Sequence, residues 1–442
     1  MVINKLTIQN FKKYESQTFE FEPHFNLLIG NNGSGKTTIL DALAVAAGVW
    51  LLDVPDPSII NINTKINSKR NIQQSDIHQI FMQRGDRGQF QPQEFAQVRV
   101  KGKINGIPHE WTRERRNGRA NNTNVKEVTG FIQQCYQRAI DSDDELLPII
   151  AYYGAGRAWL PANQRTDRTK SRSNRWAAFY DCLNERIRFA DIEIWFKDEA
   201  LERGNREGQW RPGFNAVRWA LRECVPELSA LWFDSSRQEM VFEINGEPQP
   251  FSSLSAGQCM MVALVADIAI KMVTQNAHLI PFQGEEYTGD DPPPVLKKTP
   301  GLVLIDELDA HLHPSWQRRI ASDLKRTFPR IQFVCTTHSP QLIGELEPKE
   351  IILLSDEGEA SHPPRSFGMD TNRVLEEIMG ASPRNKDIAG KLKHLLTLID
   401  NEDLDGAKKA KEELERELGD NDPELTYAES LISFLETPLA EA

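Results

Sequence analysis

The stretch that decides the fold is Gly30-Asn31-Asn32-Gly33-Ser34-Gly35-Lys36-Thr37-Thr38, which lies between a short apolar strand and an apolar helical pattern. It matches the phosphate-binding pattern G-x-x-x-x-G-K-[ST] in full. The glycines let backbone N–H groups turn toward phosphate oxygens, and the start of the following helix adds a partial positive charge. Lys36 is expected to reach the β- and γ-phosphates, and the Thr37 hydroxyl to bind Mg²⁺. Residues 30–38 therefore predict a loop that binds ATP with Mg²⁺.

A second apolar strand, Leu302 to Ile305, ends in two carboxylates, Asp306 and Glu307. We expect Asp306 to hold Mg²⁺, directly or through water, and Glu307 to polarise the attacking water as a general base. An acidic pair at the end of a strand can also simply face solvent. The phosphate-binding loop earlier in the chain favours the catalytic interpretation.

The segment Leu254-Ser255-Ala256-Gly257-Gln258 precedes a long apolar helix. Ser255 and the N–H of Gly257, at a helix start, suit an anion, and an ordinary helix N-cap is the alternative. The segment is similar to the ABC signature LSGGQ, with alanine at a tolerant position. This resemblance implies that Ser255, Gly257 and Gln258 cap the γ-phosphate that is bound by the opposite subunit.

Two further segments follow in the order that ABC ATPases show. His338, in Thr336-Thr337-His338-Ser339 after the strand 331–335, fits the switch histidine that contacts the γ-phosphate. Asp309 fits the D-loop, which runs along the interface between two heads. His311 and His313 are two residues apart, and this spacing does not place them on one helix face. We therefore reject a metal site at these two histidines.

Several basic residues have open roles. Lys12 and Lys13 follow the first strand, where they either flank the nucleotide or lie in a solvated turn. The segment 152–157 (YYGAGR) stands where a Q-loop is expected but lacks a glutamine, and Arg157 either contacts the nucleotide or a partner head, or is a buried structural arginine. Other basic residues either grip phosphate backbones or are only solvated: Arg113, Arg115, Arg116, Arg165, Arg168, Lys170, Arg172 and Arg175.

The chain alternates strand and helix patterns, which predicts an α/β fold with a mostly parallel sheet. Hairpins are predicted around Asn105-Gly106 and Asn245-Gly246, and residues 53–90 are expected to be a long loop or insertion. We expect four parts: an ATPase lobe I with an antiparallel β subdomain (1–165), a short helical arm (166–235), an ATPase lobe II (236–365) and a helical acidic C-terminal region (366–442).

Composition limits the class of protein. The net charge of −12 is concentrated after residue 400, and the remainder is near neutral, so a local basic face stays compatible with the total. The five cysteines form no CxxC pair, which favours a reducing cytoplasmic location. No apolar run approaches the ~20 residues of a membrane span. A transporter would need separate membrane subunits.

The motifs quoted above, with the N-terminal pattern of Leu6, Ile8 and Asn10-Phe11-Lys12, together resemble the SMC/RecF/OLD branch of ABC ATPases over most of residues 1–355. The finer pattern of YYGAGR, DELDAHLHPSWQ and TNRVLEEIMG is similar to short bacterial ATPases that include the ATPase subunit of the Septu anti-phage system. This implies an ABC-type head. About 215 residues separate the P-loop from the signature, too few for a long coiled coil.

The resemblance implies an ATPase whose heads dimerise around two ATP molecules, possibly in a larger oligomer, and which controls a nuclease partner in anti-phage defence. OLD-type proteins carry their own nuclease after the switch histidine, but the remaining part of this chain has no such set of carboxylates. The nuclease is therefore expected on a partner, such as an HNH subunit. The alternatives are a RecF-like, ATP-gated DNA clamp in repair and a slow-turnover ATP-binding scaffold.

Overall fold

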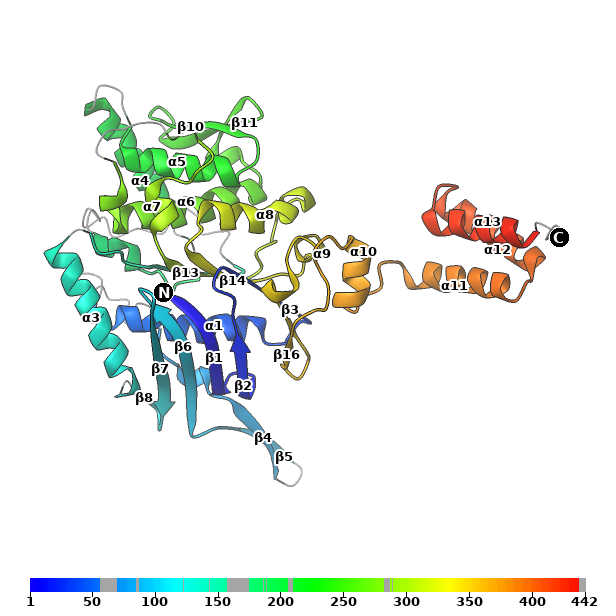
Figure 1. Cartoon of the computed structure of the whole chain (residues 1–442), viewed down its shortest axis with the longest axis horizontal. Helices are drawn as coiled ribbons and strands as arrows, with labels where there is room; N and C mark the ends of the chain where they lie inside the picture. Colours follow the sequence, from blue (N-terminus) through cyan, green and yellow to red (C-terminus); the bar gives the residue numbers. More distant parts are fainter. Residues whose placement is uncertain are drawn as a thin grey trace. The chain divides into compact units, whose positions relative to one another are not determined.

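The computed structural model describes residues 1–55, 70–84, 87–121, 123–142, 144–156, 175–185, 187, 189–205, 210–281, 287 and 289–436. The chain divides into two compact units, Met1–Met369 and Asp370–Ala442. Both are shown in Figure 1, and each is described by itself below.

The first unit is built on a six-stranded sheet in the order β16-β15-β3-β14-β13-β9. Its strands are β3 (Phe25–Gly30), β9 (Ile149–Tyr153), β13 (Gly301–Ile305), β14 (Ile331–Thr336), β15 (Ile351–Leu354) and β16 (Ala360–Ser361). All neighbours are parallel except β15 and β16. Strands β9, β13 and β14 are buried along their whole length, as expected for a parallel sheet covered on both faces. The predicted α/β class with a mostly parallel sheet is confirmed.

A five-stranded antiparallel sheet lies beside this core, in the order β2-β1-β6-β7-β8. Its strands are β1 (Val2–Phe11), β2 (Tyr14–Glu20), β6 (Phe95–Ile104), β7 (Ile107–Arg116) and β8 (Arg119–Asn121). A three-stranded sheet contains β10 (Leu228–Asp234), β11 (Glu239–Ile244) and β12 (Glu247–Pro250). The hairpins predicted at 105–106 and 245–246 are confirmed.

Helix α1 (Lys36–Ala47) lies between the two large sheets and contacts strands of both (Figure 1). The remaining helices of this unit are α3 (Lys126–Asp141), α4 (Phe189–Asn205), α5 (Pro212–Cys224), α6 (Ala256–Gln275), α7 (Pro294–Lys298), α8 (Pro314–Thr327) and α9 (Pro340–Ile343). Helix α6 packs against β9 and α5, and α5 also packs against α8. The parallel sheet thus lies between helices, and α1, the helix that follows the predicted phosphate-binding loop, lies on one side of it.

Two sequence expectations need correction. Helix α6 is, by length and composition, apolar enough to cross a membrane, although no such run was expected; most of it is buried inside the protein, so it is a core helix. The segment expected as a loop at 53–90 contains the strand β4 (Gln79–Arg84), which pairs with β5 (Arg87–Pro92) in a hairpin. Its apolar residues Phe81 and Phe90 are exposed, so no buried face gave an alternating pattern.

The second unit is helical, as predicted. It begins with α10 (Thr371–Arg373) and a short π-helix (Val374–Ile378), followed by α11 (Lys386–Asp400), α12 (Leu404–Leu418) and α13 (Pro423–Glu436). The last three helices bury their own apolar core, which includes Leu392, Leu395, Leu414 and Ile432. Asn385 and Asp403 cap α11 and α12 through their side-chain oxygens.

Candidate functional site

The phosphate-binding loop joins the end of β3 to the start of α1, in the centre of the parallel sheet. Gly35, the residue before α1, has φ 105°, a conformation that favours glycine. A Cβ at this position would also collide with the hydroxyl of Tyr14. That hydroxyl donates to the carbonyl of Ser34 at 3.2 Å, so Tyr14 supports the loop from the antiparallel sheet.

Lys36 is held at the mouth of this loop. Its side-chain Nζ donates to the carbonyls of Gly30, at 2.7 Å, and Asn31, at 3.0 Å. Burial lowers the pKa of the Lys36 ammonium, while the nearby charges of Asp306 and Glu307 act to raise it. The Lys36 ammonium therefore lies between the loop and the two carboxylates that follow β13. The negative charge of a bound triphosphate would lie there.

Thr37 and Asp306 meet as the sequence predicts for a magnesium site. The Thr37 hydroxyl donates to Asp306 Oδ2 at 2.9 Å, and the Thr336 hydroxyl donates to Asp306 Oδ1 at 2.5 Å. Asp306 is buried, so its carboxylate is fixed in position. A carboxylate and a hydroxyl are the hard oxygen donors that Mg²⁺ takes from a protein when phosphates supply further ligands. The donor set therefore fits Mg²⁺.

Glu307, the residue after Asp306, has an unusual backbone conformation. Its φ of 51° lies in the left-handed region, which is uncommon for a residue other than glycine. Its backbone N–H donates to the Thr336 hydroxyl at 2.7 Å, and the next N–H, of Leu308, donates to the Thr336 carbonyl at 2.9 Å. These bonds hold the turn after β13 to the end of β14. The turn leaves Glu307 exposed.

Asp309 and His338 are brought together at the same edge. Asp309 Oδ1 accepts from the Thr337 hydroxyl at 2.5 Å and from the backbone N–H of His338 at 3.3 Å. Ser339 donates to Gln317 Oε1 at 2.7 Å, and Gln317 Nε2 donates to the Leu312 carbonyl at 2.9 Å. The segment after β13 and the segment after β14 are thus tied together. Gln317 ends the quoted pattern DELDAHLHPSWQ, but its bond to Ser339 could not be predicted, because it depends on how the segment after β14 packs against α8.

The signature residues form the start of α6. Ser255 Oγ accepts from the Gln258 N–H at 3.3 Å, and Gln258 Oε1 accepts from the Ser255 N–H at 2.9 Å, which is a reciprocal capping box. A Cβ on Gly257 would lie 2.5 Å from the carbonyl oxygen of His311. The signature helix therefore packs directly on the Asp309 segment of its own chain. The nearby His313 caps α8 by accepting the Ser315 N–H at 3.3 Å.

Replacing Gly257 by alanine should separate these two segments. The new methyl group meets backbone, which cannot move without displacing the turn, so we expect a loss of about 1–3 kcal/mol in the free energy of unfolding. Urea unfolding measures this loss. Gly130→Ala is the matched control, because nothing lies within 4 Å of that position in helix α3. A gain of up to about 1 kcal/mol is expected there, and an equal loss in both variants would contradict the packing argument.

The two N-terminal lysines have different positions. Lys13 Nζ donates to the Gly33 carbonyl at 2.8 Å and to the Asp356 carbonyl at 2.7 Å, so it borders the phosphate-binding loop. Lys12 instead pairs with the buried Asp41 on α1, and burial lowers the pKa of its ammonium. Asp356 Oδ1 also accepts from the Asn31 side chain at 3.1 Å. The segment around Asp356 was missed by the sequence analysis, because only the pairing of β15 with β3 brings it to the loop.

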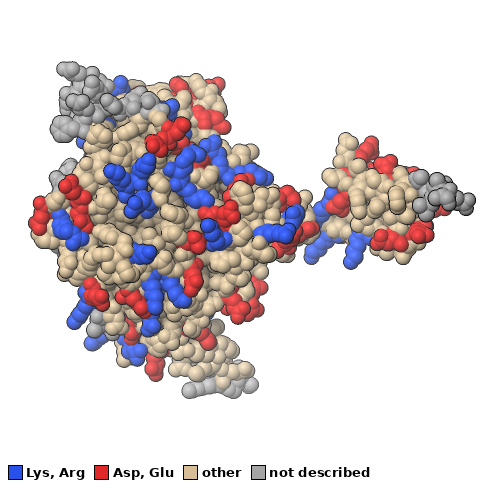
Figure 2. All heavy atoms as spheres, viewed as in Figure 1, with Lys and Arg blue, Asp and Glu red and all other residues tan. Residues whose placement is uncertain are grey.

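The basic residues that could either grip phosphate backbones or only be solvated have different positions. Arg113 is 2% exposed, so it cannot grip a phosphate backbone. Arg115 donates to the Ile72 carbonyl, Arg116 pairs with Glu114, and Arg175 donates to three backbone carbonyls. Arg157, Arg165, Arg168, Lys170 and Arg172 lie outside the described residues. Figure 2 shows basic and acidic side chains interspersed over the face in view.

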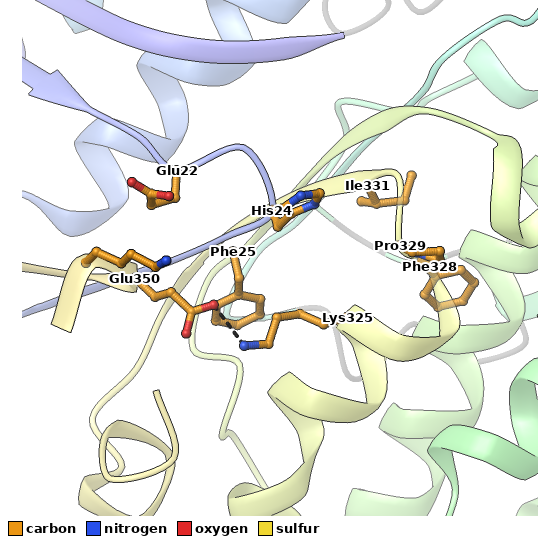
Figure 3. Close-up of a pocket in the computed structure, with 9 residues that line it drawn as sticks. Glu22, His24, Phe25, Lys325, Phe328, Pro329, Ile331 and Glu350 are labelled. Carbon is orange, nitrogen blue, oxygen red and sulfur yellow. Dashed lines mark hydrogen bonds and ion pairs between the residues drawn. The ribbon is translucent and has the colours of Figure 1, made fainter. Parts of the chain in front are cut away.

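A cavity of about 320 Å³ lies at the amino ends of the parallel strands, away from the phosphate-binding loop (Figure 3). It is lined by residues that precede or begin β3, β14 and β15, among them Phe25, Ile331 and Glu350. Lys325 crosses it to pair with Glu350 at 2.8 Å. Since the phosphate-binding loop follows the carboxyl end of β3, this cavity is separate from the ATP site.

Two family descriptions match this chain. Residues 5–207 match the family described as "AAA domain", and residues 109–344, more than half of the chain, match "AAA domain, putative AbiEii toxin, Type IV TA system". The Smc head domain with an extended coiled coil from Pyrococcus furiosus has a TM-score of 0.43 and 16% identity, covering 82% of this chain and 96% of that chain.

Three curated proteins are similar to this chain in sequence. The "Retron Ec83 probable ATPase" of Escherichia coli is 32% identical over 171 residues, 38% of this chain and 29% of that protein. The "Retron Vc95 probable ATPase" of Vibrio cholerae is 24% identical over 412 residues, 80% of this chain and 73% of that protein. The Septu protein PtuA of Bacillus mycoides is 26% identical over 362 residues, 80% of this chain and 41% of that protein. The chain thus spans less than half the length of two of these relatives.

Proposed function

This chain belongs to the AAA domain family of ATPases, in its SMC/RecF/OLD-type branch close to PtuA, and we propose that two copies pair head to head around two Mg²⁺-ATP molecules. In this arrangement the P-loop of one head and the signature of the other enclose each γ-phosphate. We further propose that the assembly works in the cytoplasm, which five buried cysteines spread along the chain without a CxxC pair support.

The observation that carries the proposal is the contrast in burial between the two halves of the site. Lys36, Ser34 and Asp306, which belong to the P-loop side, are buried. Glu307, His338 and Ser255 are exposed on the same chain. A hydrolytic site works best when water is excluded around the reacting phosphate. One head alone leaves the catalytic side open, and a second head would close it.

The residues present define how such a site would act. Lys36 and the loop N–H groups would bind the β- and γ-phosphates, and Thr37 and Asp306 would hold Mg²⁺, which when bound would supply positive charge beside the phosphoryl group. Glu307 would orient the attacking water and accept its proton. His338 contacts the γ-phosphate from the end of β14. From the facing head, Ser255 and the Gly257 N–H supply hydrogen bonds to the same phosphate.

The Ser255→Arg variant tests the two-head arrangement. Ser255 is exposed at the helix start, so the larger cationic side chain should leave the fold and ATP binding intact while it blocks the facing head. We expect ATP-dependent dimers to disappear in light scattering and hydrolysis to fall at least about 100-fold. Ser252→Arg, on the short helix just before the signature, is the control. A monomeric Ser255→Arg protein that hydrolyses ATP at the normal rate would refute the proposal.

We also propose that the dimer controls a nuclease partner in anti-phage defence. The similarity to PtuA and to two retron ATPases supports this role, and the Septu resemblance favours an HNH nuclease. Co-expression with such a nuclease from the same gene neighbourhood should give a stable complex whose DNA cleavage depends on the nucleotide. If the two proteins purify separately in ATP, in ADP and without nucleotide, this part of the proposal fails.

A further inference from the structure

Strand β9 brings one more residue to the metal side of the site. It runs parallel to β13, with Tyr152 beside Leu304 and Tyr153 beside Ile305. Because side chains alternate along a strand, Tyr152 shares a face with Leu304 and with Asp306 two residues later. Tyr153 points to the other face, where its hydroxyl donates to Asp267 of α6 at 2.7 Å. Tyr152 therefore faces the side on which α1 presents Thr37.

The hydroxyl of Tyr152 has no hydrogen-bond partner among the described residues, although the residue is only 1% exposed. A buried hydroxyl without a partner is unfavourable by roughly 1–3 kcal/mol, so its position needs an explanation. Burial raises the pKa of Tyr152, and the charges of Glu185 and Asp306 raise it further. The neutral phenol thus lies within the field of two carboxylates, one of which belongs to the predicted metal site.

One contact holds the Tyr152 ring, and two others hold Glu185 at the end of the same strand. The Arg70 guanidinium lies 5.2 Å from the centre of the Tyr152 ring and also pairs with the buried Asp41 of α1. Arg70 is also 3.5 Å from Glu185 Oε1. The backbone carbonyl of Glu185 accepts from the Gly154 N–H at 2.8 Å, so this residue is held against the end of β9. A phenol and a carboxylate therefore lie together at the end of β9, where the expected Q-loop glutamine is missing.

We propose that Tyr152 and Glu185 are positioning residues for the magnesium ion of the ATP site, acting through water that the ion retains. This inference rests on the proposed function, since it takes Thr37 and Asp306 as the direct protein ligands. Mg²⁺ keeps several waters when it binds to proteins with a nucleotide. Groups that orient such ligands change metal affinity by about 10–100-fold when removed. The unpaired Tyr152 hydroxyl and the Glu185 carboxylate supply the two polar groups for this role.

The test measures how Mg²⁺ strengthens the binding of a fluorescent ATP analogue to the full chain, which requires no turnover. For Tyr152→Phe we expect the Mg²⁺ concentration at half effect to rise about tenfold, while binding without Mg²⁺ stays within about twofold of the unchanged protein. Glu185→Gln is the second variant, and its side chain is 54% exposed, so folding is not at risk. It should shift the same midpoint in the same direction.

Tyr153→Phe is the matched control, because it removes a hydroxyl bonded on the opposite face. It should lower the Tm and leave the Mg²⁺ midpoint unchanged. The inference is overturned if both Tyr152→Phe and Glu185→Gln keep the original midpoint, or if Tyr153→Phe shifts it equally. If nucleotide binding by the unchanged protein does not respond to Mg²⁺, then the metal site itself is refuted together with the inference.

Discussion

Lys36→Ala is expected to lose detectable ATP binding while the chain stays folded. The Lys36 ammonium is bonded to the loop carbonyls and lies near the charges of Asp306 and Glu307, so its removal takes away the positive charge at the phosphate-binding loop. Truncating one member of a buried, hydrogen-bonded charge pair typically weakens binding by about 2–5 kcal/mol. Titration with a fluorescent ATP analogue measures the loss, and the thermal unfolding midpoint reports whether the fold is kept.

Lys13→Ala is the matched control for this experiment. Lys13 also touches the loop, but through hydrogen bonds to the Gly33 and Asp356 carbonyls at its outer edge. Its removal should weaken ATP binding by only about 1 kcal/mol. Equal effects of the two substitutions would show that general loosening of the loop, rather than the buried charge, governs affinity.

Glu307→Gln should separate nucleotide binding from hydrolysis. The amide keeps the size and polarity of the side chain but cannot accept the proton of the attacking water. General-base catalysis contributes about 10²–10⁴-fold, so phosphate release should fall by at least about 100-fold. ATP-bound dimers should then accumulate, because the closed state no longer converts to ADP. Phosphate release and light scattering in the presence of ATP measure the two effects.

Glu345→Gln provides a control with the same chemical change at a distant position. Glu345 pairs with Arg318 at 3.1 Å on the surface, and its replacement should leave both hydrolysis and dimerisation unchanged. If Glu307→Gln turns over ATP at the original rate, the chain is better described as a slow ATP-binding scaffold, and Glu307 has no catalytic role.

The sequence was sufficient for the parts of the site that are local. The P-loop, the acidic pair and the segment at His338 each follow a buried strand within a few residues. The carboxyl ends of parallel strands lie at one edge of a sheet, so segments that each follow such a strand are predicted to meet there. Thr37 and Asp306, 269 residues apart, do meet in the structure.

Contacts between distant segments could not be predicted in this way. Tyr14 under the loop, Gln317 behind Ser339 and Asp356 beside Asn31 depend on strand order and side-chain direction. The sequence left two roles open for Lys12, and only the structure shows that its ammonium pairs with the buried carboxylate of Asp41 on α1. Arg113 carried the same basic signal as its neighbours, and only the structure shows that it is buried.

The link through Asp309 has a consequence for kinetics. Its carboxylate holds the Thr337 hydroxyl and the His338 backbone, and the segment it stands on touches the signature helix where His311 meets Gly257. In a dimer of two heads, ATP binding at one site would alter the geometry of the other site through these few contacts. ATP binding at the two sites would then be coupled. The rate of ATP hydrolysis should therefore rise with ATP concentration more steeply than a simple hyperbola.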